Sequence, residues 1–304
     1  MTDRQSGPAA VVLGSAAGGG FPQWNCGCSL CGLVRAGDPR VRAATQVSVA
    51  VTGDGDGWLV VGASPDLREQ LARTPRLWPR SQGRDSPISG VLLTGGDIDA
   101  IAGLLVLRER QPLTLYAPAA LLEVLAANRI FDVLDPAVVK RVEVTPMEPV
   151  ACGGNLTLTL LPMPGKVPLY LESRNDTEPE AAPAYAALLQ TGSRRVIIAS
   201  ACADINEPVR KQLMQADILF FDGTLFTDDE MVVAGLGAKT GRRMGHVPIS
   251  GPDGTLARLA DLPARRIFLH INNTNPILLR DSPERREVEA AGFEVAYDGM
   301  EIAL

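Results

Sequence analysis

Aromatic side chains are scarce in this 304-residue chain, where they make up only 5% of the residues. The core must therefore be packed mainly by aliphatic side chains, and the 46% share of hydrophobic residues is sufficient for a globular protein. A surplus of basic charge is also missing, because 29 basic side chains face 35 acidic ones and leave a formal net charge of -6. This balance argues against a general nucleic-acid-binding protein, which would carry a basic stripe.

Long hydrophobic runs are absent as well. No apolar run approaches the roughly 18–20 residues that a membrane span needs, and the first residues do not have the charged and then apolar pattern of a secretory leader. The five cysteines do not make a secreted disulfide framework, because three of them lie within six positions. We therefore expect a cytoplasmic protein that neither inserts into a membrane nor binds nucleic acid.

Short apolar, β-branched segments alternate with segments of helical periodicity along the chain. The predicted strands are residues 9–13, 45–51, 57–61, 91–93, 113–117, 142–144, 156–161, 196–199, 218–221, 267–270 and 293–297. The predicted helices are residues 65–72, 101–110, 119–128, 182–190, 208–215, 254–260 and 283–291.

The grouping of the strands decides between two architectures of the α/β class. Clean alternation of strands and helices would favour a doubly wound parallel sheet, whereas hairpin-like groups near residues 45–61 and 156–171 favour two packed sheets flanked by helices. We therefore predict a four-layer αββα sandwich. The acidic, proline-containing stretch 172–183 is expected to be an exposed loop.

Cys26, Cys28 and Cys31 form the sharpest local motif, with C-x-C-x2-C spacing in a glycine-containing loop. Three thiolates at this spacing can converge on one tetrahedral ion, and thiolates select zinc. Two alternatives are three unrelated cysteines, which would be exposed to oxidation, and a catalytic thiol, which no neighbouring histidine supports. A fourth ligand must come from far away in the sequence, from His246, His270 or an Asn or Asp in a distant loop.

The two remaining cysteines, Cys152 and Cys202, each stand alone near an apolar strand. A small buried hydrophobic side chain is the usual reason for a cysteine in such a place. The glycine run at residues 18–20 lacks the Lys-Ser/Thr of a phosphate-binding loop and instead predicts a close approach of the backbone over a cavity.

Polar side chains follow several of the predicted strands. Asp97 and Asp99 come after strand 91–93, where carboxylates can bind a cation, act as a general base or cap the following helix. Further polar segments at residues 164–166, 221–224, 245–246 and 269–276 also follow strands or glycine-rich approaches. Several strand ends can therefore meet in one cavity at the edge of the sheets.

Nine segments, spread over nearly the whole chain, carry the pattern of a known family. They are LGSAAGGGFPQWNCGCSLC (13–31), ASPDLREQ (63–70), LLTGGDIDAIAGLLVLRE (92–109), NRIFDVL (128–134), PGKVPLYLE (164–172), LFFDGT (219–224), GAKTGRRMGH (237–246), FLHINNTNP (268–276) and DSPER (281–285). With these segments the chain resembles the PqqB family of pyrroloquinoline quinone (PQQ) biosynthesis proteins, in the metallo-β-lactamase superfamily.

The resemblance implies a single metallo-β-lactamase-like αββα domain over residues 1–304, with an amino-terminal zinc-binding loop at residues 25–31. It implies a role in making PQQ, as an iron- and oxygen-dependent hydroxylase of the tyrosine ring in a Glu–Tyr intermediate. The alternative is a non-catalytic carrier that binds PQQ or its precursor and aids its transport to the periplasm. The partners implied are a small, dipeptide-like precursor and other proteins of the PQQ pathway.

The resemblance also assigns residues to the structural zinc. By comparison with a phosphodiesterase of the carbon–phosphorus-lyase pathway, Cys26, Cys28 and Cys31 supply three ligands of a structural Zn²⁺. The fourth ligand of that relative is a histidine whose position here is held by Asn273, so the resemblance points to Asn273 as the fourth group.

Departures from the superfamily pattern bear on the reaction. The hydrolases place T-H-x-H-x-D-H after a strand, and the corresponding residues 94–100 of this chain keep only Asp99. Lys166 and Ala201 stand at two further ligand positions, while the final histidine is kept as His270. Because a dinuclear hydrolytic site needs two clamped cations, we expect no hydrolase of that kind unless the ligands have been misaligned.

The remaining residues suggest a mononuclear site. Asp99 and His270 are expected to hold Fe²⁺, with Asp97 as a third ligand, although the family pattern has a histidine at the position of Ala100. We expect His246 to assist proton movement. The substrate-binding set comprises Lys166, which suits a carboxylate as a point charge, together with Asn272 and Asn275.

Overall fold

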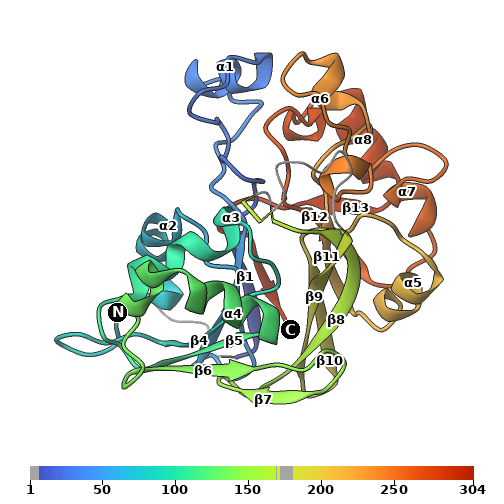
Figure 1. Cartoon of the computed structure of the whole chain (residues 1–304). Coiled ribbons are helices and arrows are strands. Elements are labelled where there is room, and N and C mark those ends of the chain that lie inside the picture. Colours follow the sequence, from blue (N-terminus) through green and yellow to red (C-terminus); the bar gives the residue numbers. More distant parts are fainter. Residues whose placement is uncertain (1–6, 169, 172–180) are drawn as a thin grey trace.

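Two facing β-sheets form the centre of the computed structural model, which describes residues 7–168, 170–171 and 181–304 (Figure 1). The strands of the first sheet, in spatial order, are β14 (Glu301–Ala303), β1 (Ala9–Gly14), β2 (Ser48–Thr52), β3 (Trp58–Val61), β4 (Ile88–Leu92), β5 (Leu113–Ala117) and β6 (Val139–Glu143). The strands of the second sheet are β13 (Phe293–Val295), β12 (Arg265–Leu269), β11 (Ile218–Asp222), β10 (Arg194–Ala199), β9 (Ala181–Thr191), β8 (Leu156–Lys166) and β7 (Val150–Cys152).

Each sheet has an antiparallel and a parallel part. In the first sheet the pairs from β3 to β6 are parallel, and in the second sheet those from β10 to β13 are parallel. Parallel strands require crossover connections, and helices in these connections cover the outer faces of the sheets. The α-helices are α1 (Ser29–Arg35), α2 (Leu67–Arg73), α3 (Ile98–Ile101), α4 (Ala119–Ala127), α5 (Glu207–Leu213), α6 (Glu230–Val233), α7 (Thr255–Arg258) and α8 (Pro283–Ala290).

Five short 3₁₀ segments complete the elements of the described residues. They are η1 (Pro75–Leu77), η2 (Ala102–Leu107), η3 (Arg129–Val133), η4 (Arg242–Met244) and η5 (Pro276–Leu278). The predicted helix 101–110 is therefore split between the end of α3 and the segment η2. No helix in the described part of the chain is long and apolar enough to span a bilayer.

Aliphatic side chains fill three layers of core, as the shortage of aromatic residues required. One cluster lies between the two sheets and includes Leu59, Leu158 and Phe220, each with no exposed surface. Two further clusters lie on the outer faces of the sheets, under α2 and α4 on one side and under α5 and α8 on the other. Burying each such side chain is worth about 1.5–3 kcal/mol. The predicted four-layer sandwich is thereby confirmed.

One predicted helix is wrong. Residues 182–190 form most of strand β9, which pairs antiparallel with β8 from Thr157↔Gln190 to Lys166↔Ala181 and with β10 on its other side. Alanine and leucine favour a helix locally, but two ladders of backbone hydrogen bonds outweigh this weak preference. Of the predicted exposed loop 172–183, residues 172–180 lie outside the described residues, and residues 181–183 belong to β9.

Candidate functional site

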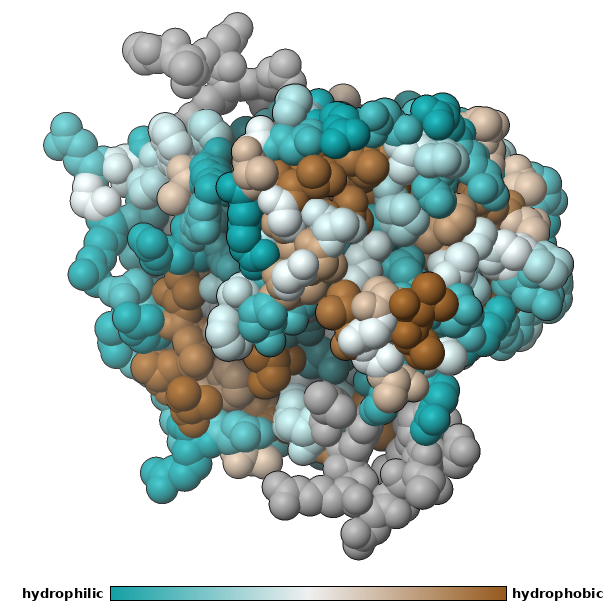
Figure 2. All heavy atoms as spheres, turned by 90° about the horizontal axis from the view of Figure 1, so that it is seen from above, coloured by the Kyte–Doolittle hydropathy of each residue, from teal (hydrophilic) through white to brown (hydrophobic). Residues whose placement is uncertain are grey.

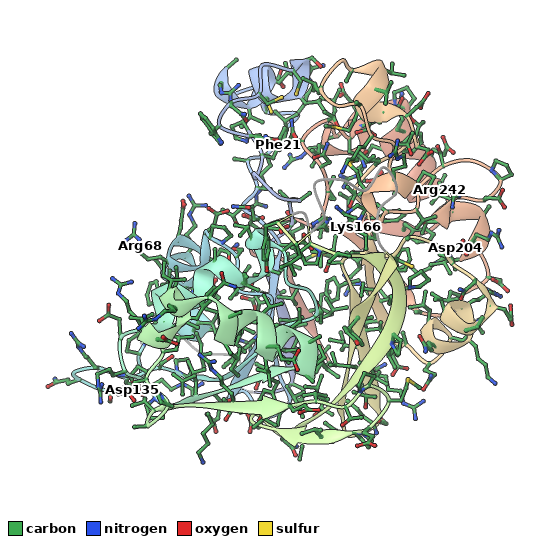
Figure 3. All side chains as sticks on the ribbon, viewed as in Figure 1. Phe21, Arg68, Asp135, Lys166, Asp204 and Arg242 are labelled. Atoms are coloured by element: carbon green, nitrogen blue, oxygen red, sulfur yellow. The ribbon has the colours of Figure 1, made fainter. Side chains whose placement is uncertain are left out.

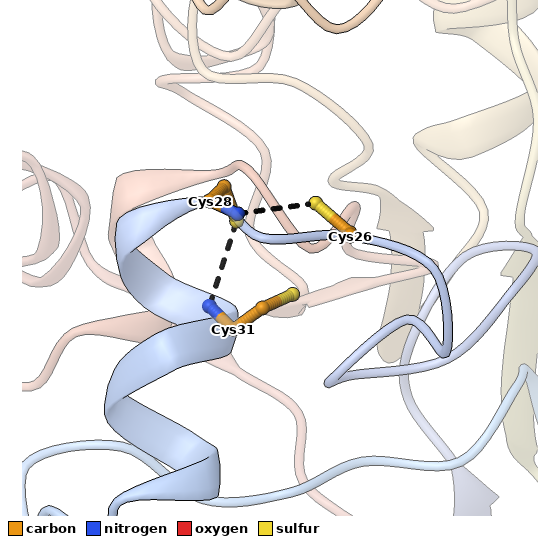
Figure 4. A group of neighbouring side chains, drawn as sticks. All are labelled: Cys26, Cys28 and Cys31. Carbon is orange, nitrogen blue, oxygen red and sulfur yellow. Dashed lines mark hydrogen bonds between the residues drawn. The ribbon is translucent and has the colours of Figure 1, made fainter.

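Cys26, Cys28 and Cys31 come together at the start of α1, where their side chains point toward one another (Figure 4). The loop is short enough for local bonds to shape it: the backbone amide of Cys28 donates to Sγ of Cys26, and that of Cys31 donates to Sγ of Cys28, both at 3.5 Å. Cys28 is also the N-cap of α1. The geometry of the three thiols is thus set by the helix start itself.

The side-chain amide of Asn273 completes this cluster from 242 or more residues away. Its nitrogen lies 3.2 Å from Sγ of Cys26, 3.6 Å from that of Cys28 and 3.4 Å from that of Cys31. Ligands about 2.1–2.3 Å from a tetrahedral zinc lie about 3.4–3.8 Å from one another, so the amide occupies the place of a fourth ligand. Oxygen and nitrogen of an amide are assigned from such networks, and rotation of the group would present its oxygen instead.

The thiols of Cys26 and Cys31 differ in acidity although they are neighbours. Burial alone would raise the pKa of Cys26, but hydrogen bonds from the Cys28 backbone and from the surrounding side chains lower it overall. Burial raises the pKa of Cys31 to about 11. The cluster therefore contains one thiol that loses its proton readily and one that resists, and a bound cation would favour the thiolate at both.

Asn273, which contacts the cysteine cluster, lies only three residues after His270 at the end of β12. His270 follows directly after β12 and has a left-handed backbone with φ of 58°, which is uncommon for a residue other than glycine. The backbone of Ile271 fixes this turn: its amide donates to the carbonyl of Ser15, and its carbonyl accepts from the amide of Ala17. Asn273 and His270 are therefore held by the same turn of chain, and each faces a different polar cluster.

The main cavity, of about 420 Å³, lies beside His270. Its polar wall contains Asp97, Asp99, His246 and His270, and Lys166 enters from the end of β8 (Figure 3). Its apolar wall is formed by Ala17, Val47, Pro118, Ala120, Leu121, Val124, Pro168, Leu171, Tyr185, Met231 and Met244. Seen from above, the face of the molecule that carries α1 and α6 has separate hydrophobic patches among hydrophilic side chains (Figure 2).

Asp99 and His270 form a close pair in this cavity, with Oδ2 and Nε2 3.4 Å apart. Burial alone would raise the pKa of Asp99, but the hydrogen bond and charge of His270 lower it overall. Burial alone would likewise lower the pKa of His270, whereas Asp99 raises it overall. Burial and then the charge of Asp99 raise the pKa of Asp97. The pKa values of these two carboxyl groups, two residues apart, are thus shifted in opposite directions, upward for Asp97 and downward for Asp99.

A buried network orients both imidazole rings. The hydroxyl of Thr224 donates to Oδ1 of Asp222 at 2.6 Å, and Nδ1 of His270 lies 2.8 Å from that hydroxyl oxygen. Nδ1 of His246 lies 2.7 Å from Oδ2 of Asp222. The simplest assignment of protons makes both Nδ1 atoms donors, so that the lone pair of a neutral ring lies on Nε2. At His270, Nε2 is the atom that faces Oδ2 of Asp99: it donates to this carboxylate when the ring is charged, and it offers its lone pair to a cation when the ring is neutral.

The sequence did not single out Asp222 and Thr224, although it identified residues 221–224 as a polar segment after a strand. Ligand atoms of Asp222, His246 and His270 all lie within 4.8 Å of one another, as in a metal site. The Thr224 hydroxyl already lies 2.6–3.1 Å from all three side chains, at the centre of the group. We therefore interpret this cluster as support for the two rings, which also stack with centroids 5.1 Å apart.

The positions that the resemblance aligns with further ligands of superfamily hydrolases reach the cavity: Gly95, Asp97, Ala100, Lys166 and Ala201 all line it. Of these, only Asp97 carries a group that can bind a cation, because Gly95, Ala100 and Ala201 have no polar side chain and an ammonium ion has no acceptor. The cavity therefore has the place of a second metal but too few ligands to hold one.

The structure separates the two asparagines that were predicted to bind substrate. Asn272 lines the cavity and donates to the hydroxyl of Thr274. Asn275 is fully buried, donates to the carbonyls of Gly223 and Thr224, and caps η5. Its prediction as a substrate-binding residue is wrong, because these backbone bonds occupy its amide and no surface is left for a ligand.

Cys202 has no exposed surface and its backbone amide donates to Asp222, whereas Cys152 is half-buried at the end of β7. Burial raises the pKa of each of these thiols to about 12. Both therefore stay protonated and apolar near neutral pH, which agrees with the prediction of small packing side chains.

Comparison with known proteins places this geometry in a family. Residues 57–271 match the model of the beta-lactamase superfamily domain. The chain is 51% identical over 297 residues to coenzyme PQQ synthesis protein B of Methylobacterium nodulans, covering 97% of this chain and 99% of the relative. It is also similar to the crystal structure of Zn²⁺-bound PqqB from Methylobacterium extorquens, with a TM-score of 0.94 and 48% identity over 97% of this chain and 100% of that one.

A more distant structure shares the fold. A diphosphatase from the PhnP family matches with a TM-score of 0.67 and 21% identity, over 98% of this chain and 97% of that one. At this identity the match supports the αββα architecture and carries no argument about the reaction.

Proposed function

The chain belongs to the coenzyme PQQ synthesis protein B family of the beta-lactamase superfamily, and from this premise we propose that it acts in PQQ biosynthesis as an iron- and oxygen-dependent hydroxylase of the tyrosine ring in a Glu–Tyr intermediate. The observation that carries the proposal is the pair Asp99–His270, in which the hydroxyl of Thr224 holds Nδ1 of His270 and thereby directs Nε2 toward the carboxylate. Two ligands beside several open positions suit a mononuclear oxygen-using site better than a dinuclear hydrolase.

The residues at this point of the cavity fit a metal. Oδ2 of Asp99 and Nε2 of His270 are 3.4 Å apart, a separation that two ligands of one ion can have, and Asp97 lines the same wall. When bound, Fe²⁺ would supply the redox chemistry with oxygen that no side chain of the cavity provides. Asp222 and Thr224 would act as positioning residues, since the carboxylate of Asp222 and the hydroxyl of Thr224 bond to the Nδ1 atoms of the imidazoles.

The rest of the cavity has the properties that an amino-acid-like substrate requires. Lys166 can bind a substrate carboxylate as a point charge, and the apolar wall of Pro118, Leu121 and Val124 can cover an aromatic ring. His246, with Nδ1 held by Asp222, has its Nε2 available to accept the proton of a phenol. Of these groups, His246 is held in a fixed orientation by its bond to the carboxylate of Asp222.

The same reasoning extends to a structural zinc, which we propose is held by Cys26, Cys28, Cys31 and Asn273. The nearly tetrahedral spacing of the Asn273 amide to the three sulfurs supports this ligand set, and a PqqB relative has been crystallised in Zn²⁺-bound form. A site closed by four protein ligands performs no chemistry. It would attach the amino-terminal arm, which contains the cysteine loop at residues 25–31, to the turn that holds His270.

The test is a single-turnover reaction. Metal-free protein is loaded anaerobically with Fe²⁺ and then mixed with oxygen, the Glu–Tyr substrate and a two-electron reductant such as ascorbate. The expected product is ring-hydroxylated, with one oxygen atom in the ring and the other reduced to water. The variants Asp99→Asn and His270→Ala should lose tightly bound iron, whereas His246→Gln should keep iron and lose turnover. Absence of product at saturating iron would reject the hydroxylase.

A carrier is the second candidate, and Ala100 favours it because no imidazole joins Asp99 there. A carrier would bind PQQ or its precursor with unchanged affinity after the active-site metal is chelated, and it would show no turnover. The variant Ala100→His separates the two functions. A hydroxylase limited by its missing ligand should bind iron more tightly and react faster, whereas a carrier should show no reaction with either residue.

A further inference from the structure

A second cavity, of about 370 Å³, lies outside the proposed active site, beside the end of β13 and the two residues that follow it. It is lined by Ser15, Arg42, Ala43, Ala44, Leu278, Arg280, Arg285, Val295, Ala296 and Tyr297. None of these residues lines the main cavity. The walls contain three guanidinium groups and no acidic side chain, on a chain whose formal net charge is -6.

Two of the three arginines are fixed by bonds that leave donors to spare. The guanidinium of Arg42 lies 4.8 Å from the ring centroid of Tyr297, and its Nη2 donates to the carbonyl of Asp298 at 3.0 Å. Nη1 of Arg285 donates to the carbonyl of Ile277 at 3.1 Å. Each guanidinium has five N–H donors, so both groups are held in place with several N–H bonds still to offer.

The third arginine carries an uncompensated charge. Among the residues that the structure describes, no hydrogen bond or ion pair involves the side chain of Arg280, which is exposed at the cavity. Arg42 has no carboxylate partner in the same set of residues, and its contacts are to a carbonyl and an aromatic ring. Of the three, only Arg285 is neutralised, by Glu289 at 2.6 Å.

The carboxylate next to Tyr297 is occupied by other partners. Asp298 is adjacent to Tyr297, but its two oxygens accept four hydrogen bonds, from the amide and hydroxyl of Ser15 and from the amide and hydroxyl of Thr45. Burial raises the pKa of Asp298 despite these bonds. The cavity is therefore a local reversal of charge on an acidic protein.

We propose that this cavity binds a small oxyanion with two or more negative charges, carried by carboxylate or phosphate groups. Guanidinium groups match both kinds of oxyanion with paired N–H···O bonds, and charge-assisted bonds of this type are stronger than neutral ones. A group of several carboxylates or a pyrophosphate fits a volume of about 370 Å³. The two free charges of Arg42 and Arg280 set the minimum charge of the ligand.

The experiment measures binding of two probes to the full-length protein by isothermal titration calorimetry at fixed ionic strength. Citrate represents the carboxylate source and pyrophosphate the phosphate source. At least one should bind at millimolar concentration or below, and added salt should weaken it. The tighter of the two identifies the source. If neither binds, the proposal is overturned.

Variants locate the binding. Arg280→Gln and Arg42→Gln should each weaken the tighter probe by about tenfold, which corresponds to one charge-assisted bond. Both side chains are exposed, so the fold is expected to persist, and circular dichroism checks this. Arg129→Gln removes a charge from the exposed side chain of a residue in η3 and is the matched control. Equal weakening by Arg129→Gln, or loss of binding in Lys166→Gln alone, would also overturn the proposal.

A footprint on the unmodified protein gives an independent readout. Phenylglyoxal modification followed by peptide mass mapping should label Arg280 rapidly, and the tighter probe should slow this reaction while leaving Arg129 unaffected. Unchanged labelling of Arg280 at saturating probe would contradict the proposed site even if calorimetry detects heat.

Discussion

Replacing Asn273 by alanine is the sharpest test of how the amino-terminal arm is held. The side-chain amide lies 3.2–3.6 Å from all three sulfurs, and the structure offers no other side chain of the described residues at that vertex. Structural zinc binds with about 10–16 kcal/mol, or about 2.5–4 kcal/mol for each of four ligands. Asn273→Ala should therefore weaken zinc binding by about a hundredfold to a thousandfold.

The assay is a competition of the protein with a colorimetric zinc chelator, combined with thermal unfolding of the zinc-loaded form. Asn273→Asp is the matched control, because a carboxylate oxygen is also a zinc ligand and should retain the metal. Zinc binding stabilises the folded state by mass action, so the melting temperature of Asn273→Ala should fall with its affinity. Zinc affinity equal to that of the parent protein in Asn273→Ala would refute this ligand set, as would equal losses in the two variants.

Three further outcomes follow from the burial and charge of single groups. Asp99→Asn should lower the pKa of His270 in metal-free protein, as followed by NMR titration. In the parent protein this pKa is raised above the unfolded value of about 6.5. The charged ring therefore stabilises the fold fully below about pH 6.5, and this contribution is lost as the pH rises through the folded pKa. In zinc-free protein at mildly alkaline pH, iodoacetamide should modify Cys26 first and Cys202, with its pKa of about 12, only on unfolding, as read by mass spectrometry. Leu158→Ala should cost about 2–5 kcal/mol in urea unfolding, since it leaves a cavity between the sheets.

Each of these outcomes has a matched control. Asp97→Asn should lower the pKa of His270 less than Asp99→Asn, because Asp97 acts on the ring through charge alone. Cys152, whose pKa is also about 12, should react as slowly as Cys202 in the folded state. Thr157→Ala, at an exposed position of the same strand as Leu158, should change the unfolding free energy by less than about 0.5 kcal/mol. An inverted order in any of the three comparisons would show that the assigned cause is wrong.

The sequence alone determined the features whose information is local. The spacing of Cys26, Cys28 and Cys31 brings three thiols together because a single helix start holds all of them. Strands that alternate with helices, and occur in hairpin-like groups, were enough to predict two packed sheets. The same holds for Asp97 and Asp99, which enter the main cavity because they follow a strand directly.

Only the tertiary structure decided the features that depend on partners distant in the chain. Residues 182–190 became a strand because β8 and β10 offer hydrogen bonds on both sides, which no local pattern encodes. Asn273 and Asn275 have similar sequence surroundings, yet one faces three sulfurs and the other is occupied by backbone carbonyls. Asp222 orients two histidines that follow it by 24 and 48 residues. Residue type sets what a side chain can bind, but packing decides which partner it meets, because buried polar groups must be satisfied wherever the fold places them.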